Sequence, residues 1–202
     1  MRPDITLSFD TSAAHCAAAL LFPGGQAEVF EDMATGQAEK LLPMVEGLLA
    51  GQGFGWGDVT LLAVGTGPGN FTGVRIAVAA ARGLALGLGV PLVGVTSLQA
   101  LRHGVSGALA CLDARRGAVY VQAEGPAALA EWEELSGFSP AFTVGYRAEE
   151  LAARFGGVAL PTPPLALSIA RVAAAGQGGK PAPFYLRGAD AAPPSDPPPV
   201  IL

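Results

Sequence analysis

The sequence predicts an α/β fold of two half-domains, in which mixed sheets are flanked by helices and the second half-domain is reduced. The chain has 202 residues, enough for one large domain or two small ones. Half of the residues are apolar and only 14% are charged, so a sizeable core can form and wholesale disorder is disfavoured. Three strand-like segments come first, followed by alternating helical and strand-like segments and by a second αβ unit.

The first unit is expected to open with a meander of three strands. Apolar and polar residues alternate over 5–10, which is the period of a half-buried strand. A second apolar run covers 17–22, and the Pro-Gly-Gly turn after it returns the chain as a third strand over 26–34. A helix is expected over 37–50, because its apolar residues fall on one face. The remaining elements expected in this unit are strands at 60–65 and 91–95 and helices at 71–88 and 97–102, the last capped by Ser97.

The second unit is expected to begin near Gly104. Its expected elements are strands at 107–112, 118–123 and 142–146, an irregular stretch at 126–138, and helices at 147–155 and 165–175. The predicted organisation is therefore a first domain over 1–103, a smaller second domain over 104–188, and an extended, mobile Pro-rich tail over 189–202. This order is typical of the ribonuclease-H-like half-domain that occurs twice in actin-like ATPases.

The charge and the cysteine content indicate which partners the protein can bind alone and in which cellular compartment it works. The net charge is −5, a poor starting point for a protein that binds nucleic acid alone. Cys16 and Cys111 both lie in apolar runs and are expected to be reduced core thiols. The N-terminus lacks the apolar core of a signal peptide, and Arg82, Pro91 and several glycines interrupt the longest apolar run, so no membrane segment is expected. We therefore expect a cytoplasmic protein.

The segment GTGPGNFTGVR at 65–75 is a glycine-rich turn between a strand and a helix. Such a turn is a candidate phosphate cradle, because backbone N–H groups and the helix N-terminus favour an anion there. No Lys closes the loop, so it is not a P-loop of the GxxxxGK[ST] type. The alternative is a tight loop that caps and packs the helix.

Two carboxylates follow strands in corresponding places. Asp10 ends the first strand, where actin-like ATPases use an acidic residue to organise the metal and nucleotide, and Asp113 ends a strand of the second unit. Across two domains these carboxylates are expected to face each other over a cleft. The alternative for Asp10-Thr11-Ser12 is a turn held by the Asp side chain.

Small residues repeat every fourth position in the helix after the loop. Gly73, Ala77, Ala81, Ala85 and Gly89 form one stripe, and an apolar stripe runs beside it through residues 76, 80, 84 and 88. Small residues let another backbone approach closely. One stripe is expected to pack on the protein's own sheet, and the other on helix 37–50 or on another subunit.

Several catalytic patterns are missing from the sequence. The two histidines, His15 and His103, form neither an HxxxH nor an HExxH pair, and no Cys/His cluster or GxSxG elbow is present. We expect no metal and no hydrolase chemistry.

Six motifs, in this order and at this chain length, resemble the TsaB (YeaZ) family, which takes part in bacterial tRNA threonylcarbamoyladenosine synthesis. They are FDTS at 9–12, LLPMVEGLL at 41–49, GPGNFTGVRIAVAAARGLA at 67–85, GVTSLQAL at 94–101, DARRGAVY at 113–120 and PFYLR at 183–187. In two respects the chain departs from the family: Gln37 stands where a His is common, and the second domain is short.

The resemblance implies an actin-like two-domain protein without a catalytic site or intrinsic cofactor. Its implied partners are a TsaD-like catalytic subunit, which carries the HxxxH histidines, and a TsaE-like ATPase, with ATP or ADP bound only in the complex. That complex adds a threonylcarbamoyl group to N6 of the adenosine beside the tRNA anticodon, so this chain would meet tRNA indirectly, and alone it would form a homodimer.

The motifs and the resemblance together predict two groups of site residues. The partner surface is expected to comprise Leu41, Leu42, Met44, Val45, Leu48, Phe71, Gly73, Val74, Ala77 and Ala81. A vestigial nucleotide loop is expected to comprise Asp10, Thr11, Gly67, Gly69, Thr72, Arg75, Asp113 and Arg115. The alternative function is an actin-like kinase or ATPase that uses Asp10, the 67–69 loop and Asp113.

Overall fold

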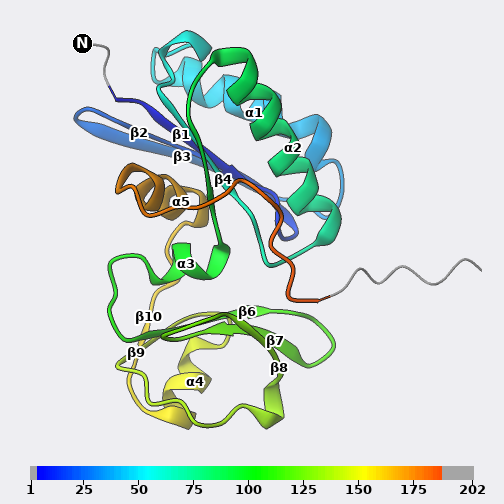
Figure 1. Cartoon of the computed structure of the whole chain (residues 1–202), viewed down its shortest axis with the longest axis vertical. Helices are drawn as coiled ribbons and strands as arrows, with labels where there is room; N and C mark the ends of the chain where they lie inside the picture. Colours follow the sequence, from blue (N-terminus) through cyan, green and yellow to red (C-terminus); the bar gives the residue numbers. More distant parts are fainter. Residues whose placement is uncertain (1–3, 188–202) are drawn as a thin grey trace, which may run out of the picture.

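The computed structural model describes residues 4–187, which form two five-stranded sheets stacked along the long axis of the molecule (Figure 1). The first sheet has the order β3-β2-β1-β4-β5 and the second the order β10-β9-β6-β7-β8. In each sheet the first three strands of the unit pair antiparallel, the fourth pairs in parallel with the first, and the fifth pairs in parallel with the fourth. The same topology thus occurs twice, which confirms the predicted fold class.

The first unit has the strands and helices that the periodicity predicts. The strands are β1 Thr6–Asp10, β2 His15–Phe22, β3 Gly25–Asp32, β4 Leu61–Gly65 and β5 Leu92–Val95. The helices are α1 Gln37–Gly51, α2 Phe71–Leu88 and α3 Ser97–Arg102, with a 3₁₀ turn at Trp56–Asp58. One detail differs: α3 is capped by Thr96, whose side chain accepts a hydrogen bond from Gln99 N at 3.1 Å, and not by Ser97.

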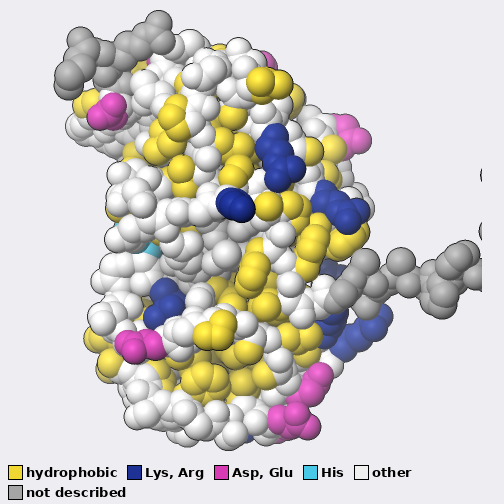
Figure 2. Space-filling model, in the orientation of Figure 1, with side chains coloured by type: hydrophobic (Ala, Val, Ile, Leu, Met, Phe, Trp, Pro, Cys, Tyr) yellow, Lys and Arg dark blue, Asp and Glu magenta, His cyan; other side chains and the backbone are white. Residues whose placement is uncertain are grey.

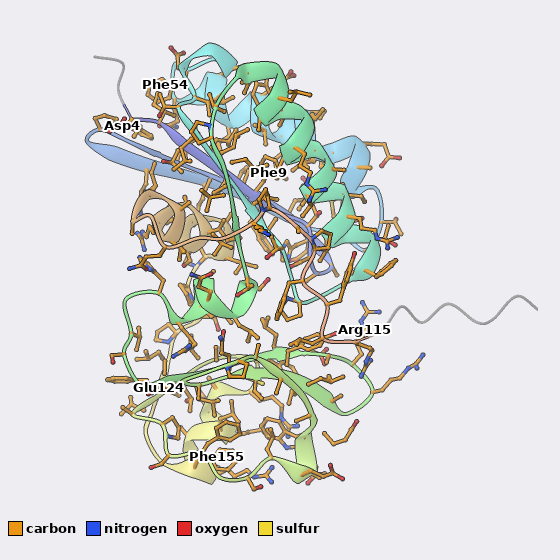
Figure 3. All side chains as sticks on the ribbon, viewed as in Figure 1. Asp4, Phe9, Phe54, Arg115, Glu124 and Phe155 are labelled. Atoms are coloured by element: carbon orange, nitrogen blue, oxygen red, sulfur yellow. The ribbon has the colours of Figure 1, made fainter. Side chains whose placement is uncertain are left out.

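Strand β1 is buried on both faces, although its alternation predicts one solvent face. The apolar residues Ile5, Leu7 and Phe9 pack under α1 and α2, and Figure 3 shows Phe9 between the sheet and these helices. The polar face is covered by helix α5 (Leu165–Ala174), and Ser8 Oγ donates a hydrogen bond to Ala166 O at 2.6 Å. A second covering helix, far away in sequence, is invisible to local periodicity.

Helix α5 belongs spatially to the first sheet. It packs on β1, β2 and β4 and against α3, with seven of its residues buried. The sequence placed it in a second domain over 104–188, but the strands of that unit lie before it and α5 returns across the boundary. The reason is that apolar residues occupy more than one side of this helix, so that both the first sheet and α3 are needed to bury them. The predicted tail at 189–202 lies outside the described residues.

The second unit contains two strands that periodicity misses. Its elements are β6 Ala108–Asp113, β7 Ala118–Gln122, β8 Ala128–Glu131, a 3₁₀ turn at Trp132–Glu134, β9 Phe142–Gly145, α4 Ala148–Phe155 and β10 Val158–Leu160. The stretch 126–138, predicted to be irregular, holds β8, which pairs with β7, and β10 was not predicted at all. Both are short edge strands, too brief to show a period of two.

Helix α2 is long and apolar enough to cross a membrane by length and composition, the one such helix in the described part of the chain. It lies instead on the first sheet beside α1 (Figure 1), with Val74, Ala77, Val78 and Ala81 in the core. The first sheet and α1 thus cover one face of α2, and the opposite face is exposed to solvent.

Candidate functional site at the cleft between the two units

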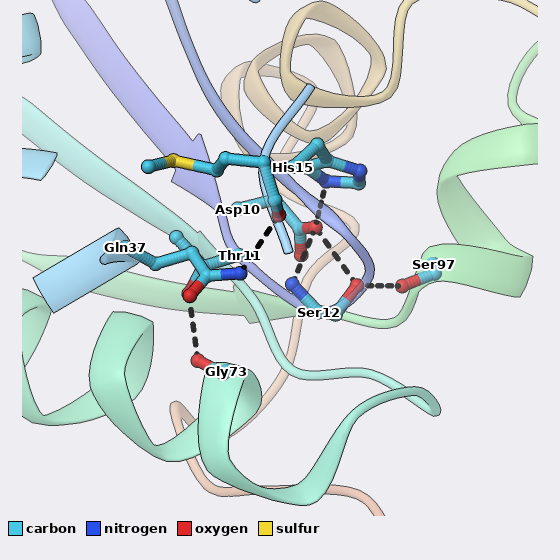
Figure 4. Close-up of polar contacts among 8 residues, drawn as sticks. Asp10, Thr11, Ser12, His15, Gln37, Gly73 and Ser97 are labelled. Carbon is cyan, nitrogen blue, oxygen red and sulfur yellow. Dashed lines mark hydrogen bonds and ion pairs between the residues drawn. The ribbon is translucent and has the colours of Figure 1, made fainter. Parts of the chain in front are cut away.

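Asp10 is the polar centre of the first unit. Its Oδ1 accepts hydrogen bonds from Ser12 N at 2.9 Å and Ser12 Oγ at 2.8 Å, and His15 Nε2 lies 2.8 Å away (Figure 4). The carboxylate is fully buried, and its other oxygen, Oδ2, has no hydrogen-bond partner among residues 4–187. The bond to Ser12 N makes the side-chain turn that the sequence left as an alternative for Asp10.

The contact between Asp10 and His15 was missed by sequence reasoning, which treated His15 as an isolated residue. The signal was available: Asp10 ends β1 and His15 begins β2, so the tight connection of an antiparallel pair brings both to one end of the sheet. His15 also packs on Phe30, with ring centroids 5.3 Å apart. Together these contacts anchor the β1–β2 turn.

The glycines of the 65–75 loop allow close packing against that turn. A side chain at Gly65 would overlap the Asp10 carboxylate, one at Gly69 would overlap Ser12 O, and one at Gly73 would overlap Thr11 O. Thr11 Oγ1 in turn donates a hydrogen bond to Gly73 O at 2.6 Å. Glycine is therefore required here by contact with protein backbone and with Asp10.

Hydrogen-bond donors at the start of α2 are already used within the protein. The Asn70 side chain accepts from Thr72 N at 3.0 Å and Gly73 N at 3.3 Å, and Asn70 N donates to Ser12 O at 2.6 Å. A phosphate cradle needs such N–H groups free. The arrangement favours the alternative of a loop that caps and packs α2.

Arg75 and Thr72 also do not contribute to a phosphate site in this loop. The Arg75 guanidinium lies 3.7 Å from the centre of the Phe71 ring, and its Nε donates to Tyr185 Oη at 3.0 Å. Thr72 is exposed, and neither residue lines the cleft described next.

A cleft of about 580 Å³ separates the two units. One wall is the β1–β2 turn with the start of α2, and the opposite wall is the end of β6 with the turn after it. Its lining residues are Ser12, Ala13, Ala14, His15, Pro68, Gly69, Asn70, Phe71, Ser97, Leu112, Asp113, Ala114, Arg115, Tyr120, Leu165, Phe184, Tyr185, Leu186 and Arg187. Of the eight predicted loop residues, only Gly69, Asp113 and Arg115 line this cleft.

The two predicted carboxylates do not face each other over this cleft. Asp113 lies on its wall, where Oδ1 accepts a hydrogen bond from Arg115 N at 2.7 Å, but Asp10 does not line it. Ser12 and His15 hold the Asp10 carboxylate inside the first unit instead. Gly67 is likewise buried, with its carbonyl accepting from Ser97 N at 2.8 Å.

Most of the predicted partner residues are core residues. Eight of the ten are buried within this chain: Leu41, Met44, Val45, Leu48, Gly73, Val74, Ala77 and Ala81. Their periodicity reflects the face that each helix turns to its own sheet, so they cannot present side chains to another subunit in this fold. Leu42 is 42% exposed and Phe71 is half-buried, so these two are accessible. Gln37 is buried too, and its Nε2 donates to Met33 O at 3.1 Å.

The cysteines are not activated for nucleophilic chemistry. Burial, reinforced by the charges of Glu31 and Asp10, raises the pKa of Cys16 to about 11, and burial raises the pKa of Cys111 to about 12. Within the described residues no three His, Cys, Asp or Glu side chains come together in a way that could hold a metal ion.

Comparisons with known proteins give consistent matches. The model of the TsaD family, described as tRNA N6-adenosine threonylcarbamoyltransferase, matches residues 31–136. The protein TsaB of Escherichia coli K12, described as a tRNA threonylcarbamoyladenosine biosynthesis protein, is 39% identical over 120 residues, which are 56% of this chain and 52% of that protein. The chain therefore spans about half the length of this curated relative.

Two further matches cover more of the chain. An uncharacterized protein of Mycobacterium tuberculosis H37Rv is 38% identical over 173 residues, 79% of each chain. A crystal structure from Pseudomonas aeruginosa, described as an uncharacterized protein with similarity to peptidase YEAZ, superposes with a TM-score of 0.73 at 30% identity, covering 91% of this chain and all of that one.

Proposed function

The chain belongs to the TsaB (YeaZ) family, and from this premise we propose that it is a non-catalytic subunit of the bacterial complex that forms threonylcarbamoyladenosine in tRNA. In this role it stabilises and activates a TsaD-like catalytic subunit, which transfers the threonylcarbamoyl group to N6 of the adenosine beside the anticodon. A TsaE-like ATPase joins the pair, and ATP or ADP binds only in the complex. The chain acts in the cytoplasm and dimerises with itself when the partner is absent.

The observation that carries this proposal is the open face of α2. Apart from Thr72, Arg75 and Arg82 the helix is built from apolar residues and glycine, yet only five of its eighteen residues are buried. Leu86 is 86% exposed, and Ala79, Gly83 and Gly87 lie exposed around it. Apolar surface of this kind marks protein–protein contacts, and small residues allow close helix approach.

Helix α1 extends this surface. It lies beside α2 on the same face of the first sheet (Figure 1) and exposes Leu42. We define the outer helix face as Leu42, Ala79, Gly83, Leu86 and Gly87. These residues replace the buried ones as the proposed contacts of both the heterodimer and the homodimer.

Introducing a charge on the outer helix face should abolish the complex without unfolding the chain. We expect Ala79→Glu to prevent co-purification with a TsaD-like subunit in size-exclusion chromatography, because a long charged side chain holds the two surfaces apart and loses hydration in the contact. The matched control is Ala153→Glu on the exposed side of α4, which should leave the complex intact. A complex that survives Ala79→Glu contradicts the proposed surface.

One observation favours the alternative of an actin-like kinase or ATPase. The cleft is large enough for a ligand, and the unpartnered Asp10 Oδ2 lies beside the loop that begins at Gly65. Calorimetric binding of ATP to the isolated chain at micromolar affinity, lost in Asp10→Asn while that variant stays folded, would support this alternative. Absence of that binding supports the non-catalytic role.

A further inference from the structure

Half of the positive charges of this acidic protein lie along one strip. Six of its twelve Lys and Arg residues follow the C-terminal segment at 180–187 and the elements that it touches. We define the basic strip as Arg75, Arg82, Arg115, Arg116, Lys180 and Arg187. Figure 2 shows dark-blue side chains over α2, the C-terminal segment and the adjoining rim of the second unit, where magenta side chains also lie nearby. One exposed carboxylate, Asp113, stands beside Arg115 in the same turn. The net charge of −5 hides this asymmetry.

Three hydrogen bonds fix the strip in place. Arg82 Nε donates to Pro181 O at 2.9 Å, and Arg75 Nε donates to Tyr185 Oη at 3.0 Å. At the other end Arg187 donates to Ala114 O at 2.9 Å, which ties the segment to the turn after β6. Each of these bonds uses one of the five donors of a guanidinium group. The C-terminal segment therefore connects the strip residues of both units, and two of them, Arg115 and Arg187, line the cleft.

The turn after β6 displays two of these charges at a conformational cost. Arg115 and Arg116 have φ values of 62° and 54°, in the left-handed region that favours Asn and Gly. Both side chains are exposed (Figure 3 labels Arg115 at the rim), and neighbouring Gly117 completes the turn. The turn therefore presents two exposed cations at the rim of the second unit.

Aromatic rings accompany the charges. Phe71 and Tyr185 lie with ring centroids 4.9 Å apart beside Arg75, and Tyr185 is 37% exposed. Surfaces that bind single-stranded nucleic acid combine a line of positive charge, which follows the phosphates, with aromatic and Arg groups on which bases stack. A purely acidic peptide segment would use the charges but offers no ring to stack on Tyr185.

We propose that the basic strip, together with Tyr185, binds single-stranded RNA directly. The phosphates follow the arginines from α2 to the turn after β6, and a base packs against the exposed part of Tyr185. This inference deepens the proposed function, on which the identification of the RNA as a tRNA loop rests.

The test measures binding of a dye-labelled RNA stem-loop with a single-stranded loop to the full isolated chain, by fluorescence anisotropy over a salt series. The double variant Arg116→Glu, Lys180→Glu changes two exposed cations that make no side-chain hydrogen bond or ion pair within residues 4–187. We expect about tenfold weaker binding or more, and a log–log salt slope reduced by about 1 to 2. Tyr185→Ser should weaken binding about fivefold or more through lost stacking.

The control carries the same charge change away from the strip. Lys40 and Arg171 lie on α1 and α5 and pair with Glu31 and Gln26. Lys40→Glu, Arg171→Glu should leave RNA binding within about twofold, because distant charges are screened. Equal losses in both double variants, or no RNA binding at low salt, overturn the proposal.

Two measurements separate this proposal from others. If heparin competes as well as RNA and Tyr185→Ser has no effect, the strip is a docking site for acidic polymers or proteins, and the RNA proposal is wrong. Co-purification of the strip variants with a TsaD-like subunit tests the proposed function independently, since the outer helix face is intact in them.

Discussion

At the scale of residues, Asp10 links the turn, the loop and the strand. Its Oδ1 is shared by Ser12 and His15, and its carboxylate fills the space that a side chain at Gly65 would occupy. The residue in the position of an actin-like catalytic carboxylate thus has a structural role in this chain, because it satisfies buried donors of the β1–β2 turn.

Removing that carboxylate should cost stability. We expect Asp10→Ala to lower the free energy of unfolding by about 2 kcal/mol or more, because Ser12 N and Oγ are left as unpaired buried donors. Asp10→Asn keeps an acceptor for Ser12 and should retain more of the stability. Urea denaturation of the three proteins measures this, and equal stability of Asp10→Ala and the parent would contradict the role.

At the scale of elements, helix α2 packs one face against the first sheet and exposes the opposite face. Its stripe through Gly73, Ala77 and Ala81 is buried against the sheet, as expected, while the stripe beside it is half-buried and the far side is open. Gly83 lies on that open side, with nothing near enough to contact an added Cβ. A glycine inside a helix makes that helix less stable than an alanine would. No contact within the chain requires glycine at position 83, so we infer that a partner helix approaches closely there.

Gly83→Ala should therefore separate stability from association. The free chain should gain up to about 1 kcal/mol, because alanine is the better helix former. Binding to a TsaD-like subunit should weaken, because the added methyl group prevents close helix approach. Gly47→Ala on α1, also without neighbours, is the stability control. Thermal denaturation and analytical size exclusion measure the two effects, and unchanged association would argue against Gly83 as a contact.

At the scale of the whole molecule, the second unit is inserted between two parts of the first. The chain leaves the first sheet after β5, builds the second sheet, and returns as α5 to cover β1 and β2. The segment after α5 then runs back over both, with Gly94 and Gly179 bridged and Phe184 N donating to Thr66 O at 2.8 Å. The first unit is complete only when residues from both ends of the described chain are present.

This topology predicts how fragments behave. Residues 1–103 alone should aggregate, because the face of β1 and β2 under α5 would be exposed. Joining 1–103 to 164–187 through a flexible linker should restore a soluble α/β fold, measured by circular dichroism and gel filtration. A soluble, cooperatively folded 1–103 fragment would show that α5 is dispensable.

Local pattern determined most of the elements and the family. Periodicity places β1 to β5, α1, α2 and the main strands of the second unit, because alternation and helical stripes are properties of short segments. The six motifs between Phe9 and Arg187 indicated the family, because a motif is recognised by its residues and their spacing without knowledge of the structure. The short edge strands β8 and β10 were missed, since a few residues cannot display a period.

Only the tertiary structure decided which faces and charges are available. The same helical stripe could contact a sheet or a partner, and the fold assigned Val45 and Ala77 to the core and Leu86 to the surface. It joined Asp10 to His15, used the loop's N–H groups internally, and placed six cations from three distant segments along one strip. These outcomes depend on contacts between residues far apart in sequence, which spacing along the chain does not encode.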